Sequence, residues 1–191
     1  MTDLSEGRFD DETEFVGEVI REAGRLLLAS LDDVGPVSRK RATELVTDLD
    51  GRVEAFLLER LSAAFPGDAV VAEESGDSSG TSDRTWFVDP LDGTTNYAHG
   101  HPMFCVSIAC LRQGRIEHGV VLDPVRDESF VASRGHGAQL NERRIRVSRR
   151  TGLDGALIGT GIPYRDVETH LSAYMGMLES VTRRSRGIRR A

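Results

Sequence analysis

Two helix-like segments ahead of a long run of short apolar strands constrain the fold of this chain most. Apolar residues recur at three- and four-residue spacing over residues 12–30 and again over 48–64, which predicts two amphipathic helices. After Gly67 the pattern changes to short apolar runs separated by glycine-rich turns, which predicts largely antiparallel strands up to residue 161. A further helix is expected over 166–182. The order of these segments predicts a layered α/β protein.

Two stretches read as loops. Residues 35–42 are polar and basic and begin with Gly35 and Pro36, which are strong breakers of regular structure. Residues 76–83 are polar and rich in serine and glycine, so a flexible loop is expected there as well.

The composition excludes several classes of protein. Of the 191 residues 39% are hydrophobic and 29% are charged, the balance of an ordinary globular protein. No apolar run approaches the roughly 18 residues of a membrane span, so we expect no membrane partner. The first residues are acidic and lack the features of a signal peptide, so a cytoplasmic location is expected.

The second half of the chain is net basic and ends in an arginine cluster between Arg183 and Arg190. Such a cluster can bind nucleic acid. Arginines are also favoured at the carboxyl end of a helix, because they interact well with its dipole. We regard the second explanation as the better one and predict no nucleic-acid partner.

Acidic residues follow two of the apolar strands. Glu73 and Glu74 come after one strand, and Asp89 and Asp92 come after another. Carboxylates in such positions are costly unless a cation neutralises them. Oxygen ligands without a nearby cysteine or histidine favour Mg²⁺, with Mn²⁺ as the alternative. The simpler alternative is that the segment containing the two aspartates is a surface turn, since Asp-Pro and Asp-Gly are common turn dipeptides.

The residues after Asp89 add a site for an anion. Pro90 stiffens the backbone, so the Leu91 carbonyl could turn toward the same cation. If a helix begins after Gly93, its free N–H groups and the positive end of its dipole face that cation. A divalent cation beside an anion site is what a phosphoryl group requires.

Three motifs carry a resemblance to a known family: AEES at 72–75, WFVDPLDGTTNY at 86–97 and GTGIPY at 159–164. Together they resemble the inositol monophosphatase family of Mg²⁺-dependent, lithium-sensitive phosphatases. The resemblance implies a layered αβαβα sugar-phosphatase fold. It further implies an amino-terminal αβ domain over 1–152, which carries the metal site, and an incomplete second αβ domain over 153–191.

The resemblance also implies a role for individual residues. The implied metal ligands all supply oxygen atoms: Glu73, Asp89, the Leu91 carbonyl, Asp92 and, for a third and weaker cation, Asp50. Glu73 and Thr94 would orient the attacking water, and Glu74 would polarise Thr94. The phosphate group would lie against Asp92 and the backbone N–H groups of Gly93 and Thr94.

For function, the resemblance implies an inositol-phosphate phosphatase that hydrolyses a small phosphate monoester, with inositol 1-phosphate as the leading substrate, and a homodimer. Fructose 1,6-bisphosphate, histidinol phosphate and 3′-phosphoadenosine 5′-phosphate remain alternatives, as does a non-catalytic regulatory relative. The family's WD motif, which supplies one more metal-ligating aspartate, is absent, since Trp86 is the sole tryptophan. We therefore expect this chain to bind one divalent cation and to turn over substrate poorly or not at all.

Overall fold

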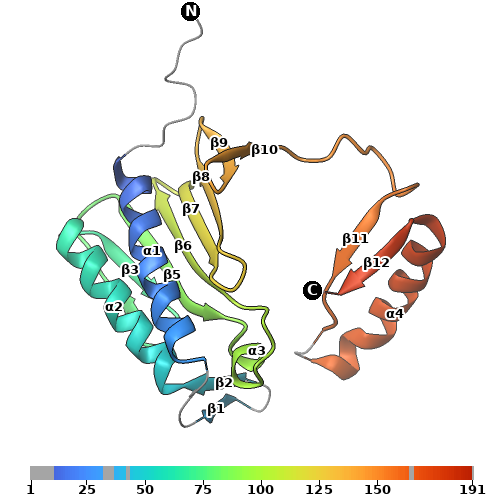
Figure 1. The fold of residues 1–191 in the computed structure, drawn as a ribbon, viewed down its shortest axis with the longest axis horizontal. Coiled ribbons are helices and arrows are strands. Elements are labelled where there is room, and N and C mark those ends of the chain that lie inside the picture. Colours follow the sequence, from blue (N-terminus) through green and yellow to red (C-terminus); the bar gives the residue numbers. More distant parts are fainter. Residues whose placement is uncertain (1–10, 32–36, 42–43, 164–165, 191) are drawn as a thin grey trace, which may run out of the picture. The chain divides into compact units, whose positions relative to one another are not determined.

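The computed structural model describes residues 11–31, 37–41, 44–163 and 166–190 (Figure 1). Contacts within the chain divide it into two units, Met1–Arg146 and Val147–Ala191, which are described here separately. The boundary expected from the sequence, after residue 152, lies close to this division.

An eight-stranded sheet forms the first unit, in the order β10-β9-β8-β7-β6-β5-β3-β4. Its strands are β3 (Ala69–Ala72), β4 (Gly76–Ser78), β5 (Arg84–Asp92), β6 (Cys105–Arg112), β7 (Arg115–Asp123), β8 (Glu128–Ser133), β9 (Gly137–Leu140) and β10 (Arg143–Ile145). Neighbouring strands are antiparallel, except that β3 and β5 run parallel. The predicted α/β class is confirmed.

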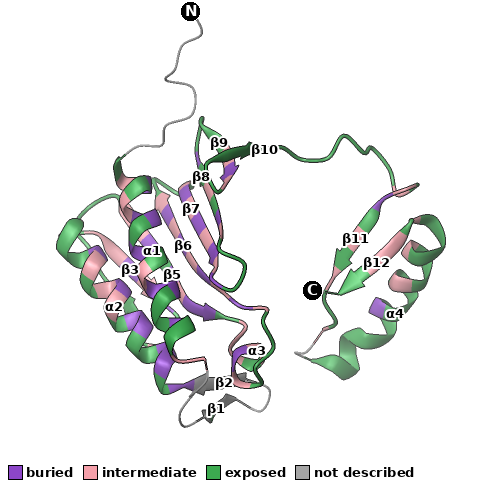
Figure 2. Ribbon diagram, viewed as in Figure 1, coloured by how far each residue is buried: buried purple, intermediate pink, exposed green. Residues whose placement is uncertain are grey.

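Two helices, α1 (Asp11–Ala29) and α2 (Asp48–Ala64), lie side by side on one face of this sheet (Figure 1). Their apolar stripes and alternate residues of the strands form the core, which Figure 2 shows as buried stripes along these elements. The fully buried side chains include Ile20, Leu27, Leu57, Trp86 and Ile108. Burying residues of this size contributes about 1.5–3 kcal/mol each, so helix packing on the sheet dominates the stability of the unit.

Both predicted loops contain strands. Val37–Arg41 forms β1, which pairs antiparallel with β2 (Glu44–Thr47), and the loop expected over 76–83 begins with β4. Polar residues dominate β1 and β4, so neither segment shows the alternation by which strands are recognised. In both cases pairing with the neighbouring strand, and not local propensity, decides the structure.

The second unit is a βαβ arrangement. Strand β11 (Leu157–Thr160) pairs in parallel with β12 (Gly187–Arg190), and helix α4 (Val167–Arg184) connects them. The Tyr174 hydroxyl on α4 lies 3.0 Å from Thr160 Oγ1 on β11. The helix matches the prediction over 166–182 closely, whereas β12 was not predicted. Within the described part of the chain, no helix has the length and apolar character needed to cross a membrane.

Candidate active site

The ends of two neighbouring strands bring the predicted acidic residues together. Strands β3 and β5 are parallel, and Ala72 pairs with Val88. Glu73, the first residue of the turn after β3, and Asp89, within β5, therefore come next on the two neighbouring segments. Strand β5 then bulges against β6, because Asp89 faces Ser107 while Asp92 faces Cys105. A bulge changes the direction of the side chains that follow it. This irregularity is how Asp92, three residues after Asp89, reaches the same end of the sheet.

The raised pKa of Asp89 shows that this residue interacts with the neighbouring acids. Burial raises the pKa of Asp89 to about 7, with further contributions from the charges of Glu73 and Asp92 and from a hydrogen bond with Glu73. A hydrogen bond that raises a carboxyl pKa is one donated by its protonated form. The Leu91 N–H opposes this shift by donating to Asp89 Oδ1 at 3.1 Å. Asp89 is therefore held between acids that disfavour its charge.

These residues fit a divalent cation. Within the described residues, no three acidic, histidine or cysteine side chains are already spaced to share one ion. The donors at the strand ends are nevertheless all oxygen atoms, the ligand type that Mg²⁺ and Mn²⁺ prefer. A divalent charge would also relieve the repulsion that raises the pKa of Asp89.

Thr94 begins the short helix α3 (Thr94–Ala98) directly after this strand. Its Oγ1 lies 3.0 Å from Asp50 Oδ1 and 3.0 Å from the Leu91 carbonyl oxygen. Gly93 precedes it with φ of 97°, and a Cβ there would lie 3.0 Å from the Met103 carbonyl oxygen. Only glycine satisfies both the backbone angle and the close approach, so Gly93 allows the chain to turn and present Thr94.

Asp50 is buried in the first turn of α2 and serves two partners. One carboxyl oxygen accepts from the Thr47 N–H at 2.8 Å and from Thr47 Oγ1 at 2.5 Å. The other lies beside the Thr94 hydroxyl. The sequence assigned Asp50 to an outer cation and gave the polarisation of Thr94 to Glu74. The geometry places Asp50 in contact with Thr94, whereas the role of Glu74 stays a prediction.

Glu54 is a residue that the sequence analysis did not single out. Its side chain is buried, and its two oxygens accept hydrogen bonds from the N–H groups of Glu74 and Ser75, each at 2.8 Å. The signal in the sequence is an acid four residues after Asp50, on the helix face that also carries Leu57. A buried acid among apolar residues needs a partner, so this position could have been noticed.

The similarity of this chain to known proteins shows its family. The sequence model of the "Inositol monophosphatase family" matches residues 10–191. The chain belongs to this family. A Nus factor SuhB of Pseudomonas aeruginosa is 49% identical over 177 residues, which cover 90% of this chain and 65% of that protein. The chain thus spans about two thirds of the length of this curated relative.

Solved structures of the family share the fold. The extragenic suppressor protein suhB of Bartonella henselae superposes with a TM-score of 0.89 at 37% identity, over 95% of this chain and 70% of that one. An IMPase of Thermotoga maritima gives a TM-score of 0.83 at 32% identity, over 95% and 68% of the two chains. The resemblance to the inositol monophosphatase family and the expected fold are therefore confirmed.

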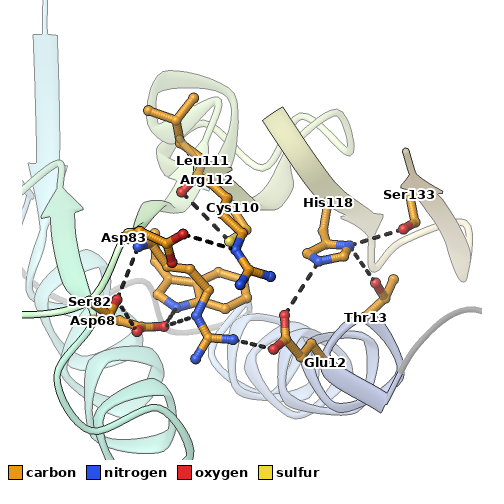
Figure 3. Close-up of polar contacts among 12 residues, drawn as sticks. Glu12, Thr13, Asp68, Ser82, Asp83, Cys110, Leu111, Arg112, His118 and Ser133 are labelled. Atoms are coloured by element: carbon orange, nitrogen blue, oxygen red, sulfur yellow. Dashed lines mark hydrogen bonds and ion pairs between the residues drawn. The ribbon is translucent and has the colours of Figure 1, made fainter. Parts of the chain in front are cut away.

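A second polar cluster lies at the other end of β5 and contains none of the predicted site residues (Figure 3). Arg84 pairs with Glu12 and, at 2.9 Å, with Asp68, which also accepts from Trp86 Nε1 at 2.8 Å. His118 Nδ1 lies 2.8 Å from Thr13 Oγ1 and 3.1 Å from Ser133 Oγ. A cavity of about 560 Å³ opens beside this cluster, lined by Asp11, Glu12, Arg112, Gln113, Glu117 and His118.

Proposed function

We propose that this chain carries the catalytic centre of a phosphatase that hydrolyses a small phosphate monoester with a metal-activated water. The observation that carries the proposal is the meeting of Glu73, Asp89 and Asp92 at the ends of two parallel strands, beside a Thr94 hydroxyl that contacts Asp50. Membership of the inositol monophosphatase family supports the same reaction class.

The proposed ligands of Mg²⁺ or Mn²⁺ are Glu73, Asp89, the Leu91 carbonyl and Asp92, with Asp50 close to an outer position. When bound, the cation supplies Lewis-acid stabilisation of the phosphate oxygens and lowers the pKa of water. Asp89 is central to the proposed site because it interacts with both Glu73 and Asp92.

Thr94 and Glu73 orient the attacking water in this proposal. The Thr94 hydroxyl has one hydrogen, and donation of it to Asp50 Oδ1 leaves the oxygen lone pairs free to accept from water. Asp50 is itself fixed by its two contacts with Thr47. Groups that are held in place in this way can raise the rate by lowering the entropic cost of alignment.

The phosphate group lies, in this proposal, against the backbone N–H groups at the start of α3. The first N–H groups of a helix lack partners within the helix and favour an anion. Gly93 removes the side chain that would otherwise collide with the Met103 carbonyl. Inositol 1-phosphate is the leading candidate substrate, and a homodimer in the cytoplasm is part of the proposal.

Phosphate release by the chain tests this function. The substrates to compare are inositol 1-phosphate, fructose 1,6-bisphosphate, histidinol phosphate and 3′-phosphoadenosine 5′-phosphate, each with Mg²⁺, Mn²⁺ or chelator, and with Li⁺ as inhibitor. Asp127→Asn is a matched control, because Asp127 is an exposed aspartate outside the site. Metal-dependent release by the parent and the control, with none by Asp89→Asn, supports the proposal. Metal-independent release contradicts it.

One alternative has its own support. The Pseudomonas aeruginosa relative, 49% identical to this chain, carries the name Nus factor, which suggests a regulatory binding protein. A chain with only that role would bind its partner equally well before and after Asp89→Asn and would release no phosphate. Loss of phosphate release on Asp89→Asn argues for the enzyme.

A further inference from the structure

Helix α2 contacts both halves of the candidate site from a single face. Asp50 and Glu54 are four residues apart, so they lie one turn apart on the same side of the helix. Both side chains are only 2% exposed. Asp50 contacts Thr94 after β5, whereas Glu54 contacts the turn after β3 that begins with Glu73.

The contact made by Glu54 fixes both the position and the orientation of the backbone at Glu74 and Ser75. Its two oxygens accept from two successive backbone N–H groups, those of Glu74 and Ser75, both at 2.8 Å. Two hydrogen bonds to neighbouring peptide groups hold those groups against rotation. The peptide that links Glu73 to Glu74 is one of the two, so the backbone that carries the Glu73 side chain is held directly.

The sheet holds only the two ends of this turn, since β3 pairs with β4 as far as Ala72 and Gly76 and leaves residues 73–75 outside the pairing. Pairing between β3 and β5 ends at Ala72 and Val88, one residue before Glu73 and Asp89. Thr94 lies still further along, beyond the bulge in β5. A helix is a stiffer connection, because its residues advance by about 1.5 Å each in a fixed geometry.

We infer that helix α2 sets the separation between Glu73 and Thr94, and that Glu54 is a positioning residue for Glu73. The inference rests on the proposed function, in which these two groups orient the attacking water. Asp50 holds the Thr94 side and Glu54 holds the Glu73 side. A shift of either contact changes where the two groups point, although Glu54 itself touches neither substrate nor water.

A purely structural role for Glu54 makes a different prediction. If the residue only attaches α2 to the sheet, its replacement lowers the stability of the protein and leaves the properties of the folded molecules unchanged. If it positions Glu73, the folded molecules themselves lose affinity for a divalent cation. The two roles are therefore separated by measurements on the folded state.

The test compares Glu54→Asp and Glu54→Gln with the parent chain, and Glu59→Gln is the control because Glu59 is an exposed acid on the same helix. Glu54→Asp keeps the carboxyl group but withdraws it by one methylene. Glu54→Gln keeps the length but replaces one acceptor by an N–H₂ donor. Three quantities are measured on protein that circular dichroism shows to be folded: Mn²⁺ affinity by calorimetry, hydrogen exchange of the Glu74 and Ser75 amides, and kcat for phosphate release.

We expect Mn²⁺ affinity to fall about 10-fold in both variants, within the range found when groups that orient metal ligands are replaced. The two amides should exchange about 10-fold faster or more, because one or both acceptors are lost. In a chain that releases phosphate, kcat should fall by about 10- to 100-fold with KM changed little. Glu59→Gln should match the parent in all three.

Parent-like Mn²⁺ affinity in folded Glu54→Gln, together with faster exchange of the two amides, overturns the inference and leaves Glu54 a structural contact. If Glu54→Asp fails to fold, Glu54→Gln decides alone, since it preserves one hydrogen bond and the packing volume. If the parent releases too little phosphate to measure, the Mn²⁺ and exchange measurements still decide the role of Glu54. The proposed function fails separately, if phosphate release does not depend on the metal.

Discussion

Acidic side chains at the two ends of strand β5 have opposite electrostatic surroundings. At its first residue, Arg84 lies between Glu12 and Asp68 (Figure 3). Burial by itself lowers the pKa of Arg84, but the two acids outweigh that effect and raise it. At the last residues of the same strand, Asp89 and Asp92 share their surroundings with Glu73. Burial and those negative charges raise the pKa of Asp89.

Under the proposed function, this difference separates acids that stabilise the fold from acids that bind a cation. Asp68 has a permanent cation beside it and two further hydrogen-bond donors, Trp86 Nε1 and Ser82 Oγ. Asp89 accepts one backbone N–H and otherwise faces other acids. A carboxyl group whose pKa is raised by neighbouring acids is a candidate for a functional site. The predictions below test this contrast.

The largest effect is expected from Asp89→Asn. Removing this charge takes away the carboxylate that interacts with both Glu73 and Asp92, so metal-dependent phosphate release should fall by about 10³-fold or more. The measurement is phosphate release at saturating Mg²⁺, with Asp127→Asn as the control. Activity within tenfold of the parent would show that Asp89 is not a metal ligand.

A smaller loss of kcat for phosphate release is expected from Thr94→Ala. The hydroxyl orients the nucleophile and does not bind the cation, so kcat should fall by about 10²-fold while Mn²⁺ affinity stays near that of the parent. Thr94→Ser, which keeps the hydroxyl, should recover most of the rate. The assigned role is wrong if Mn²⁺ affinity falls and kcat for the metal-loaded protein does not.

At the other end of β5, where Arg84 neutralises Glu12 and Asp68, the expected effect is on the stability of the protein. Arg84→Gln leaves Glu12 and Asp68 without their cation, and Asp68 is almost completely buried. Because Arg84 and Glu12 are partly exposed, the loss should be below the full value for a buried pair, about 2 kcal/mol in the free energy of unfolding by urea. Arg112→Gln, which breaks an exposed pair with Asp83, should cost much less stability. If Arg84→Gln and Arg112→Gln lose the same free energy of unfolding, Arg84 does not stabilise the fold by neutralising Glu12 and Asp68.

The pH dependence of Mn²⁺ binding is gradual, about 10-fold per pH unit below the pKa of Asp89. Asp89 must lose its proton to bind a cation, so Mn²⁺ affinity should rise with pH up to about 7 and level off above it. The stability of the metal-free protein should instead fall as the pH rises. Because the folded-state pKa lies above the unfolded value of 3.8, the stabilisation from protonated Asp89 is complete below about pH 4. It is lost as pH rises through 7.

Asp89→Asn provides the check on this pH dependence, since asparagine resembles the protonated acid. Metal-free Asp89→Asn should unfold at a higher temperature than the parent at pH 8 and at nearly the same temperature at pH 4. Parent and variant with parallel stability curves across this range would show that the pKa of Asp89 is not raised.

The sequence alone predicted the elements whose pattern is local. Helix α1 was expected over 12–30 and occupies Asp11–Ala29, because its apolar spacing matches the helical repeat. The acids after β3 and β5 were recognised for a similar reason, since a carboxylate that follows an apolar strand is unusual wherever it occurs. The motifs around Glu73 and Asp89 were also sufficient to indicate the family.

Only the tertiary structure decided which acid meets which partner. Asp50 and Thr94 are 44 residues apart and Glu12 and Arg84 are 72 apart, so no local pattern connects them. Strand β4 likewise exists because β3 lies beside it, although its residues are polar. The sequence determines where charge and apolar surface occur along the chain. The packing of α1 and α2 on the sheet decides which charges are neutralised, because that depends on distances between side chains that are remote in sequence.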